Sequence, residues 1–147
     1  MFVIALVSGV WAGAYDVLKL RDGADCAQLG TGAAVRDELL ALAEGDVAPS
    51  YVPVRAAGCL VEGFAGDPVV VERAKGWVAE KRWAGLGIVV AGRIDAFAPE
   101  DGVAIAKAAV AGSDVATRVR IAKRIARSER EEVRVVAEGV DAGEGGR

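Results

Sequence analysis

Apolar residues recur at steps of three and four from residue 33 onward, which is the spacing of one face of an α-helix. In residues 33–44, Val35, Leu39 and Leu42 form such a face, and Gly45 follows its end. Hardly any stretch shows the period of two expected of half-buried strands. The pattern predicts an all-α fold, with further helices over residues 52–64, 68–80, 83–97, 102–111, 115–127 and 131–140.

Turn-forming residues mark where these helices begin. Pro53 falls in a first turn, where its missing N–H breaks no helical hydrogen bond. Asp67 is expected to cap the helix that starts at Pro68, and Asp114 is expected to cap the helix predicted over residues 115–127. Thr31 is interpreted as the cap of the first predicted helix.

One predicted helix, residues 83–97, is rich in glycine. Gly85, Gly87 and Gly92 each cost about 0.5 to 1 kcal/mol relative to Ala in a helix interior. A helix is favoured if its neighbours pack against it very closely. The alternative for residues 85–91 is a strand.

Three pairs of a small and a large apolar residue repeat along the chain, each pair three positions apart in a predicted helix. The first members are 34 and 31 residues apart, and a period of about 20 to 50 residues is typical of stacked helical units. The pairs are Ala57 with Leu60, Ala91 with Ile94, and Ala122 with Ile125.

Paired helices with this period resemble HEAT-like and armadillo-like repeats, and the shorter period resembles the compact bacterial HEAT unit. In that family the second helix of a pair often carries a Val-Arg-x-x-Ala-x-x-Leu-like stretch, and Val54, Arg55, Ala57 and Leu60 resemble it with one residue fewer between Arg and Ala. The resemblance covers about residues 33–140. It implies a short α-solenoid of about three antiparallel helix pairs, with a surface for holding a partner. An irregular helical bundle is the alternative.

The length of 147 residues and the hydrophobic content of 53% are those of one domain with a real core. Residues 33–140 are expected to form the repeat domain. Residues 15–32, which are rich in Asp and Gly, are expected to be an irregular lead-in. Residues 141–147 are expected to be a flexible polar tail.

Charge and composition exclude several function classes. The formal charge of −3 gives no bulk attraction to nucleic acid or anionic membrane. The chain has no histidine, which excludes imidazole-based triads and His-containing zinc sites. The adjacent acids Asp37 with Glu38 and Glu100 with Asp101 are interpreted as helix-end charges. We therefore expect no enzyme activity, and no catalytic, metal or cofactor site.

Residues 1–14 form an uncharged apolar run that is too short to span a bilayer. Its length matches the apolar region of a secretory signal peptide, and Ala12 with Ala14 gives the small-x-small pattern that precedes cleavage. The prediction is a mature chain that begins at Tyr15 and is periplasmic or secreted. The positively charged start of a signal peptide is missing, so the alternative is a cytoplasmic protein in which residues 2–11 are a buried strand or helix.

The two cysteines, Cys26 and Cys59, are compatible with one disulfide in an oxidising compartment. Cys59 lies in a predicted helix and Cys26 in a segment interpreted as a loop. The alternative is two free thiols, with Cys59 buried as a small apolar residue.

The most distinctive polar cluster lies in the predicted helix 115–127. Arg120, Lys123, Arg124 and Arg127 are three or four residues apart, which places them near one stripe suited to an anionic partner. The alternative is a solvated face in which Arg127 pairs with Glu131.

The sequence thus predicts a non-enzymatic protein–protein interaction module built from HEAT-like repeats. The alternative function is a nucleic-acid-binding helical repeat protein that uses the basic stripe.

Overall fold

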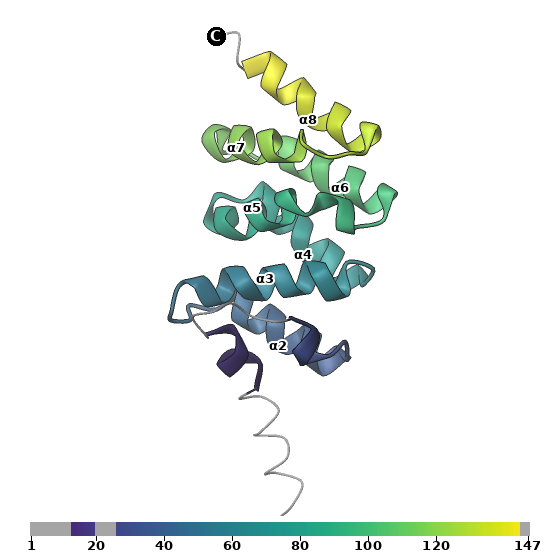
Figure 1. Ribbon diagram of the computed structural model, residues 1–147. Coiled ribbons are helices and arrows are strands. Elements are labelled where there is room, and N and C mark those ends of the chain that lie inside the picture. The colour runs from purple at the N-terminus through teal and green to yellow at the C-terminus, as the bar shows by residue number, and fades with distance from the viewer. Residues whose placement is uncertain (1–12, 20–25, 145–147) are drawn as a thin grey trace, which may run out of the picture. The chain divides into compact units, whose positions relative to one another are not determined.

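The computed structural model describes residues 13–19 and 26–144. These residues form α-helices joined by turns and short 3-10 helices, with no strand among them, so the all-α prediction is confirmed (Figure 1). The chain divides into two compact units, Met1–Phe64 and Ala65–Arg147, which we call the N-terminal and C-terminal units. None of the helices in the described ranges has the length and apolar character needed to cross a membrane.

In the N-terminal unit, two long helices pack against each other. Their apolar faces meet around Leu39, Val52 and Leu60, each at most 1% exposed. The helix predicted over residues 33–44 has those bounds, and the next begins one residue earlier than expected. These helices are α2 (Ala33–Glu44) and α3 (Tyr51–Phe64).

The segment before α2 is more ordered than the irregular lead-in expected over residues 15–32. Residues 13–18 are helical, and η1 (Cys26–Leu29) is a 3-10 helix. Leu18 is fully buried. Burial of this side chain removes apolar surface from water and so holds the short helix to the unit. Residues 1–12, which carry most of the predicted signal segment, lie outside the described residues.

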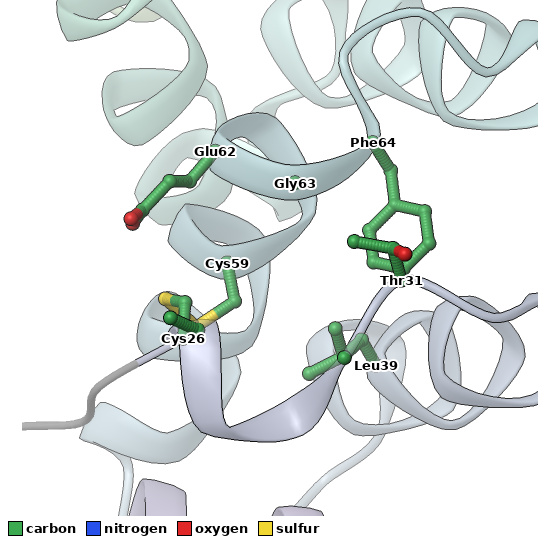
Figure 2. A pocket seen from close by; sticks show the side chains of 9 residues that line it. Cys26, Thr31, Leu39, Cys59, Glu62, Gly63 and Phe64 are labelled. Atoms are coloured by element: carbon green, nitrogen blue, oxygen red, sulfur yellow. A yellow bond between two sulfur atoms is a disulfide. The ribbon is translucent and has the colours of Figure 1, made fainter.

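A disulfide joins Cys26 in η1 to Cys59 in α3, 33 residues apart, so the disulfide prediction is confirmed. Their Cα atoms are 5.3 Å apart, and the alternative of free thiols is wrong. Figure 2 shows the sulfur atoms at one side of a cavity of about 210 Å³, with Thr31 and Phe64 at the other. The disulfide ties the segment before α2 to the buried side of α3.

The C-terminal unit has two rows of helices. In one row α4 packs against α6 and α6 against α8, and in the other α5 packs against α7 (Figure 1). The rows meet because α4 also contacts α5, and α7 contacts both α6 and α8. The elements are α4 (Pro68–Ala79), η2 (Lys81–Trp83), α5 (Ala84–Gly92), η3 (Ile94–Ala96), α6 (Pro99–Val110), α7 (Val115–Ile125) and α8 (Glu131–Glu144).

Two of the three predicted caps are confirmed. The Asp67 carboxylate accepts the Val69 N–H at 2.9 Å at the start of α4, and the Asp114 carboxylate caps α7. The prediction for Thr31 is wrong. Gly32 is the N-cap of α2 and no side chain caps this helix, because Thr31 lies one residue too early.

The glycine-rich segment is helical, so the strand alternative is wrong. It is shorter than the helix predicted over residues 83–97, because 3-10 turns precede and follow α5. A Cβ on Gly87 would lie 2.5 Å from the Trp77 carbonyl oxygen, whereas Gly85 has nothing within 4 Å. Close packing between α4 and α5 therefore accounts for one glycine of this helix.

The three repeating Ala and aliphatic pairs are all buried. Exposure ranges from 0% for Ala57 and Leu60 to 3% for Ile94. Each pair begins in α3, α5 or α7, and Ile94 itself lies in η3. The periodic pattern therefore marks core positions. At the chain end, α8 continues to Glu144, beyond the point where the flexible tail was expected to begin.

Candidate anion-binding surface on helix α7

Helix α7 separates an apolar face from a basic one. Its first turn is held by Asp114, whose carboxylate accepts the Thr117 N–H at 3.0 Å and the Thr117 hydroxyl at 2.6 Å. These hydrogen bonds lower the pKa of the Asp114 carboxyl, the Thr117 hydroxyl contributing most. Ile121, Ala122 and Ile125 are fully buried against the rest of the unit. Burial of this face fixes which side chains of α7 are left to solvent.

The four cations of the predicted stripe, Arg120, Lys123, Arg124 and Arg127, are all exposed. Within the described part of the chain none of their side chains forms an ion pair or hydrogen bond, so the alternative pairing of Arg127 with Glu131 is absent. We call these four residues the α7 stripe. Their charges are available to an external anion.

Two residues of the α7 stripe border a pocket of about 220 Å³. Gly92, at the end of α5, lies beside the Arg124 side chain, and a Cβ there would be in ordinary contact with Arg124 Cδ at 3.9 Å. Arg120 and Lys123 are not part of the lining. The pocket is lined by residues 91–96, Arg124, Arg127 and Ser128.

Asp95 places one negative charge at this pocket. Its carboxylate accepts hydrogen bonds from the Ser128 hydroxyl and from the Glu129 N–H, the latter at 2.9 Å. Burial alone would raise the pKa of Asp95, but these hydrogen bonds and the nearby Arg130 charge lower it below its ordinary value. Asp95 thus fixes η3 to the turn between α7 and α8, and so shapes one wall of the pocket.

The contact between Asp95 and Ser128 was missed by sequence reasoning. The residues are 33 positions apart, and neither belongs to a motif. Arg130, in the same turn, makes a second link to the segment around η3, because its side chain donates to the Phe97 carbonyl oxygen. The only signal in the sequence is that the separation of 33 residues between Asp95 and Ser128 is close to the repeat spacings of 34 and 31 residues.

The acidic pairs lie in different settings. Glu100 and Asp101 are in the first turn of α6, as expected for helix-end charges. Asp37 is exposed and pairs with Arg36 at 2.9 Å, but Glu38 lies inside α2 and is 6% exposed. Asp37 also lies inside α2, so the interpretation of Asp37 and Glu38 as helix-end charges is wrong.

Three of the four residues of the α7 stripe are arginines, and the fourth is a lysine. Guanidinium groups match carboxylate and phosphate oxygens in geometry and charge. The chain has no histidine to serve as a base. No set of three Cys, Asp or Glu residues in the described ranges is placed to hold a metal ion.

Comparison with known proteins identifies no family for this chain, so a role has to be argued from the fold and from the α7 stripe. No family model matches the chain, and no curated protein or solved structure matches it significantly.

Proposed function

We propose that the chain is a non-enzymatic HEAT-like interaction module whose α7 stripe binds an acidic segment of a partner protein. The observation that carries the proposal is the exposure of four cations on one helix, none with a partner in the described part of the chain. Exposed side chains of one sign on a single face attract an oppositely charged partner and orient it.

The helix order of the C-terminal unit supports the repeat part of this proposal. Pro68 begins α4 and Pro99 begins α6, 31 residues later, which is also the distance between the buried residues Ala91 and Ala122. In a repeat protein, equivalent helices bury equivalent positions against their neighbours. The pairs α4 with α5 and α6 with α7 fit this arrangement.

An acidic protein segment fits the α7 stripe better than a nucleic acid does. Glu129, Glu131 and Glu132 are exposed just beyond its end, and Asp95 lies at the pocket. A long phosphate backbone would meet these carboxylates, whereas a short acidic segment can end at Arg127. The alternative, a nucleic-acid-binding repeat protein, is an outcome of the experiment below.

The proposal includes export and removal of residues 1–14. The Cys26–Cys59 disulfide supports it, because disulfides persist in oxidising compartments outside the cytoplasm. Intact mass measurement of the protein from its own host tests it. We expect a chain that starts at Tyr15, whereas a mass that includes Met1 would place the protein in the cytoplasmic alternative.

Fluorescence anisotropy with labelled probes tests the binding function. The probes are a glutamate-rich 12-residue peptide, a peptide of the same length with glutamine in place of glutamate, and a 12-nucleotide single strand of DNA. The double variant Arg124→Gln/Arg127→Gln should bind the acidic peptide about tenfold or more weakly, since two charge-assisted contacts are lost. The glutamine peptide should not bind.

The matched control is Arg82→Gln/Lys107→Gln, which removes the same charge from exposed residues elsewhere in the C-terminal unit. It should change affinity less than twofold. Equal loss in both double variants would show attraction by overall charge and contradict the proposal. Tighter binding of DNA than of peptide, falling steeply with salt, would support the nucleic-acid alternative.

A further inference from the structure

Glu38 is a buried carboxyl group in the N-terminal unit that has no partner. It is 6% exposed, and in the described part of the chain it accepts no hydrogen bond and forms no ion pair. Burial of a charged group is costly unless hydrogen bonds or an opposite charge compensate for it. Desolvation accordingly raises the pKa of the Glu38 carboxyl.

Glu38 lines a pocket of about 210 Å³ together with the short helix before it in the chain. Gly13, Ala14 and Val17 contribute one wall, and Ala14 is only 3% exposed. Among the described residues of the lining, Glu38 is the only titratable one, and the others are Gln28, Leu29 and Val35. The carboxyl group thus lies beside the residues that precede Tyr15.

The three cations that the structure describes in the N-terminal unit are engaged elsewhere. Lys19 pairs with Asp16 at 2.9 Å, and Arg36 pairs with Asp37 at 2.9 Å. Arg55 donates to the Leu18 carbonyl oxygen at 2.8 Å and lies over the Tyr51 ring. None of these contacts involves Glu38.

Three long-range hydrogen bonds hold the short helix to α3 and to the loop before it. The Tyr15 hydroxyl donates to the Ala48 carbonyl oxygen at 2.8 Å, and the Tyr51 hydroxyl donates to the Lys19 carbonyl oxygen at 2.6 Å. The Arg55 contact with Leu18 is the third. All three are made by residues from Tyr15 onward, so they survive the loss of residues 1–14.

We propose that Glu38 is the partner of the α-ammonium group of Tyr15, which forms when the chain is cut between Ala14 and Tyr15. The inference rests on the export and cleavage proposed above. A signal peptidase would hydrolyse this peptide bond, so that water gives its hydroxyl to the Ala14 carbonyl carbon and a proton to the Tyr15 nitrogen. The amine then takes up a further proton from solvent, since an α-amino group is largely protonated near neutral pH.

Cleavage would change the pocket in two ways that suit each other. It removes Gly13 and Ala14 from the wall, which exposes the Glu38 carboxylate. It also creates a positive charge one residue from Ala14, and consecutive Cα atoms are about 3.8 Å apart. The new N-terminus would be held there by the hydrogen bond from the Tyr15 hydroxyl to Ala48. In the processed chain the Glu38 carboxylate would thus face a positive charge where Gly13 and Ala14 stood.

The test compares the chain that begins at Tyr15 with the same chain carrying an acetylated N-terminal amine. Each is prepared with and without Glu38→Gln, with the disulfide intact. Unfolding of the N-terminal unit is followed by hydrogen exchange in α2 and α3. Acetylation should lower its folding equilibrium constant about tenfold, the effect of losing a charge-assisted hydrogen bond. In the Glu38→Gln variant, acetylation should have no effect.

Asp37→Asn is the matched control, because it neutralises the adjacent, exposed carboxyl group. Acetylation should destabilise that variant as it does the unmodified sequence. NMR titration of the Glu38 carboxyl carbon should also give a lower pKa in the free-amine protein than in the acetylated one. Equal effects of acetylation with and without Glu38→Gln, or a Glu38 pKa that does not respond, would refute the ion pair.

The outcome is separable from that of the α7 stripe. Neither acetylation nor Glu38→Gln should change binding of the acidic peptide, which is measured on the other unit. A protein from the native host that keeps residues before Tyr15 would overturn the ion pair and leave peptide binding untouched. Failure of peptide binding would leave the ion pair in place.

Discussion

The two units of the chain are stabilised in different ways. In its described residues the N-terminal unit has two long α-helices and a short one, and a disulfide joins η1 to α3. The C-terminal unit has five α-helices in two rows, and it relies on close helix packing at Gly87 and on the Asp95 hydrogen bonds. A small set of helices buries little surface, so a covalent link compensates for core that is missing.

Removal of the disulfide should give the largest difference between the units. Cys26→Ser/Cys59→Ser frees a loop closed over 33 residues, which should destabilise the N-terminal unit by about 3 to 4 kcal/mol. Hydrogen exchange should show faster opening in α2 and α3. Exchange in α6 and α7 should be unchanged.

Chemical reduction of the unmodified protein is the control for packing defects introduced by serine. It should reproduce the pattern of the double variant. Equal acceleration of exchange in both units would contradict the view that the disulfide acts on one of them.

Substitution of Gly87 should act on the other unit. In Gly87→Ala, the added methyl group would lie 2.5 Å from the Trp77 carbonyl oxygen and 2.8 Å from Ile121 Cδ1. Such overpacking should cost about 1 to 3 kcal/mol, measured by urea denaturation with hydrogen exchange in α5. Gly85→Ala is the matched control in the same helix, because Gly85 has open space around it.

Gly85→Ala should leave stability unchanged or raise it by up to about 1 kcal/mol, the difference in helix propensity. A similar loss in both variants would contradict the view that contact with α4 decides the effect of alanine in α5, because Gly85 has open space around it.

The units should also respond to pH with opposite signs, the smallest of the three effects. The pKa of Glu38 is raised above its ordinary value of 4.5, so the N-terminal unit should lose stability as pH rises through the folded-state pKa. The pKa of Asp95 is lowered below 3.8, so the C-terminal unit should lose stability as pH falls through its folded-state pKa.

Two single variants, made in the full-length chain, show which carboxyl group causes each pH effect. Glu38→Gln should remove the loss of protection in α2 above pH 4.5, and Asp95→Asn should reduce the loss in α7 at acid pH. Part of the acid effect should remain in Asp95→Asn, because the Asp114 carboxyl also has a lowered pKa. Identical pH profiles for the two units would rule out this assignment.

Helix positions and the buried repeat pairs could be predicted from the sequence because they depend on local spacing. The apolar steps of three and four gave α2 its bounds, and Asp67 with Pro68 marked the start of α4. Arg124 and Arg127 were found for the same reason, since the buried face of α7 determines its exposed face.

Contacts between distant segments could not be predicted in this way. The hydrogen bond from Ser128 to Asp95 and the burial of Glu38 both depend on how separate helices meet. The short helix at residues 13–18 was missed because its stability comes from burial of Leu18 and from hydrogen bonds to α3, and not from periodicity.

The disulfide also limits how far the chain can be stretched. A force applied to the two ends passes through the Cys26–Cys59 bond and bypasses the residues between them. Those 33 steps would otherwise add about 110 to 120 Å of extended chain at about 3.3 to 3.6 Å per residue. With the bond intact, the whole of α2 and the part of α3 before Cys59 cannot be drawn out by tension, however weakly they pack.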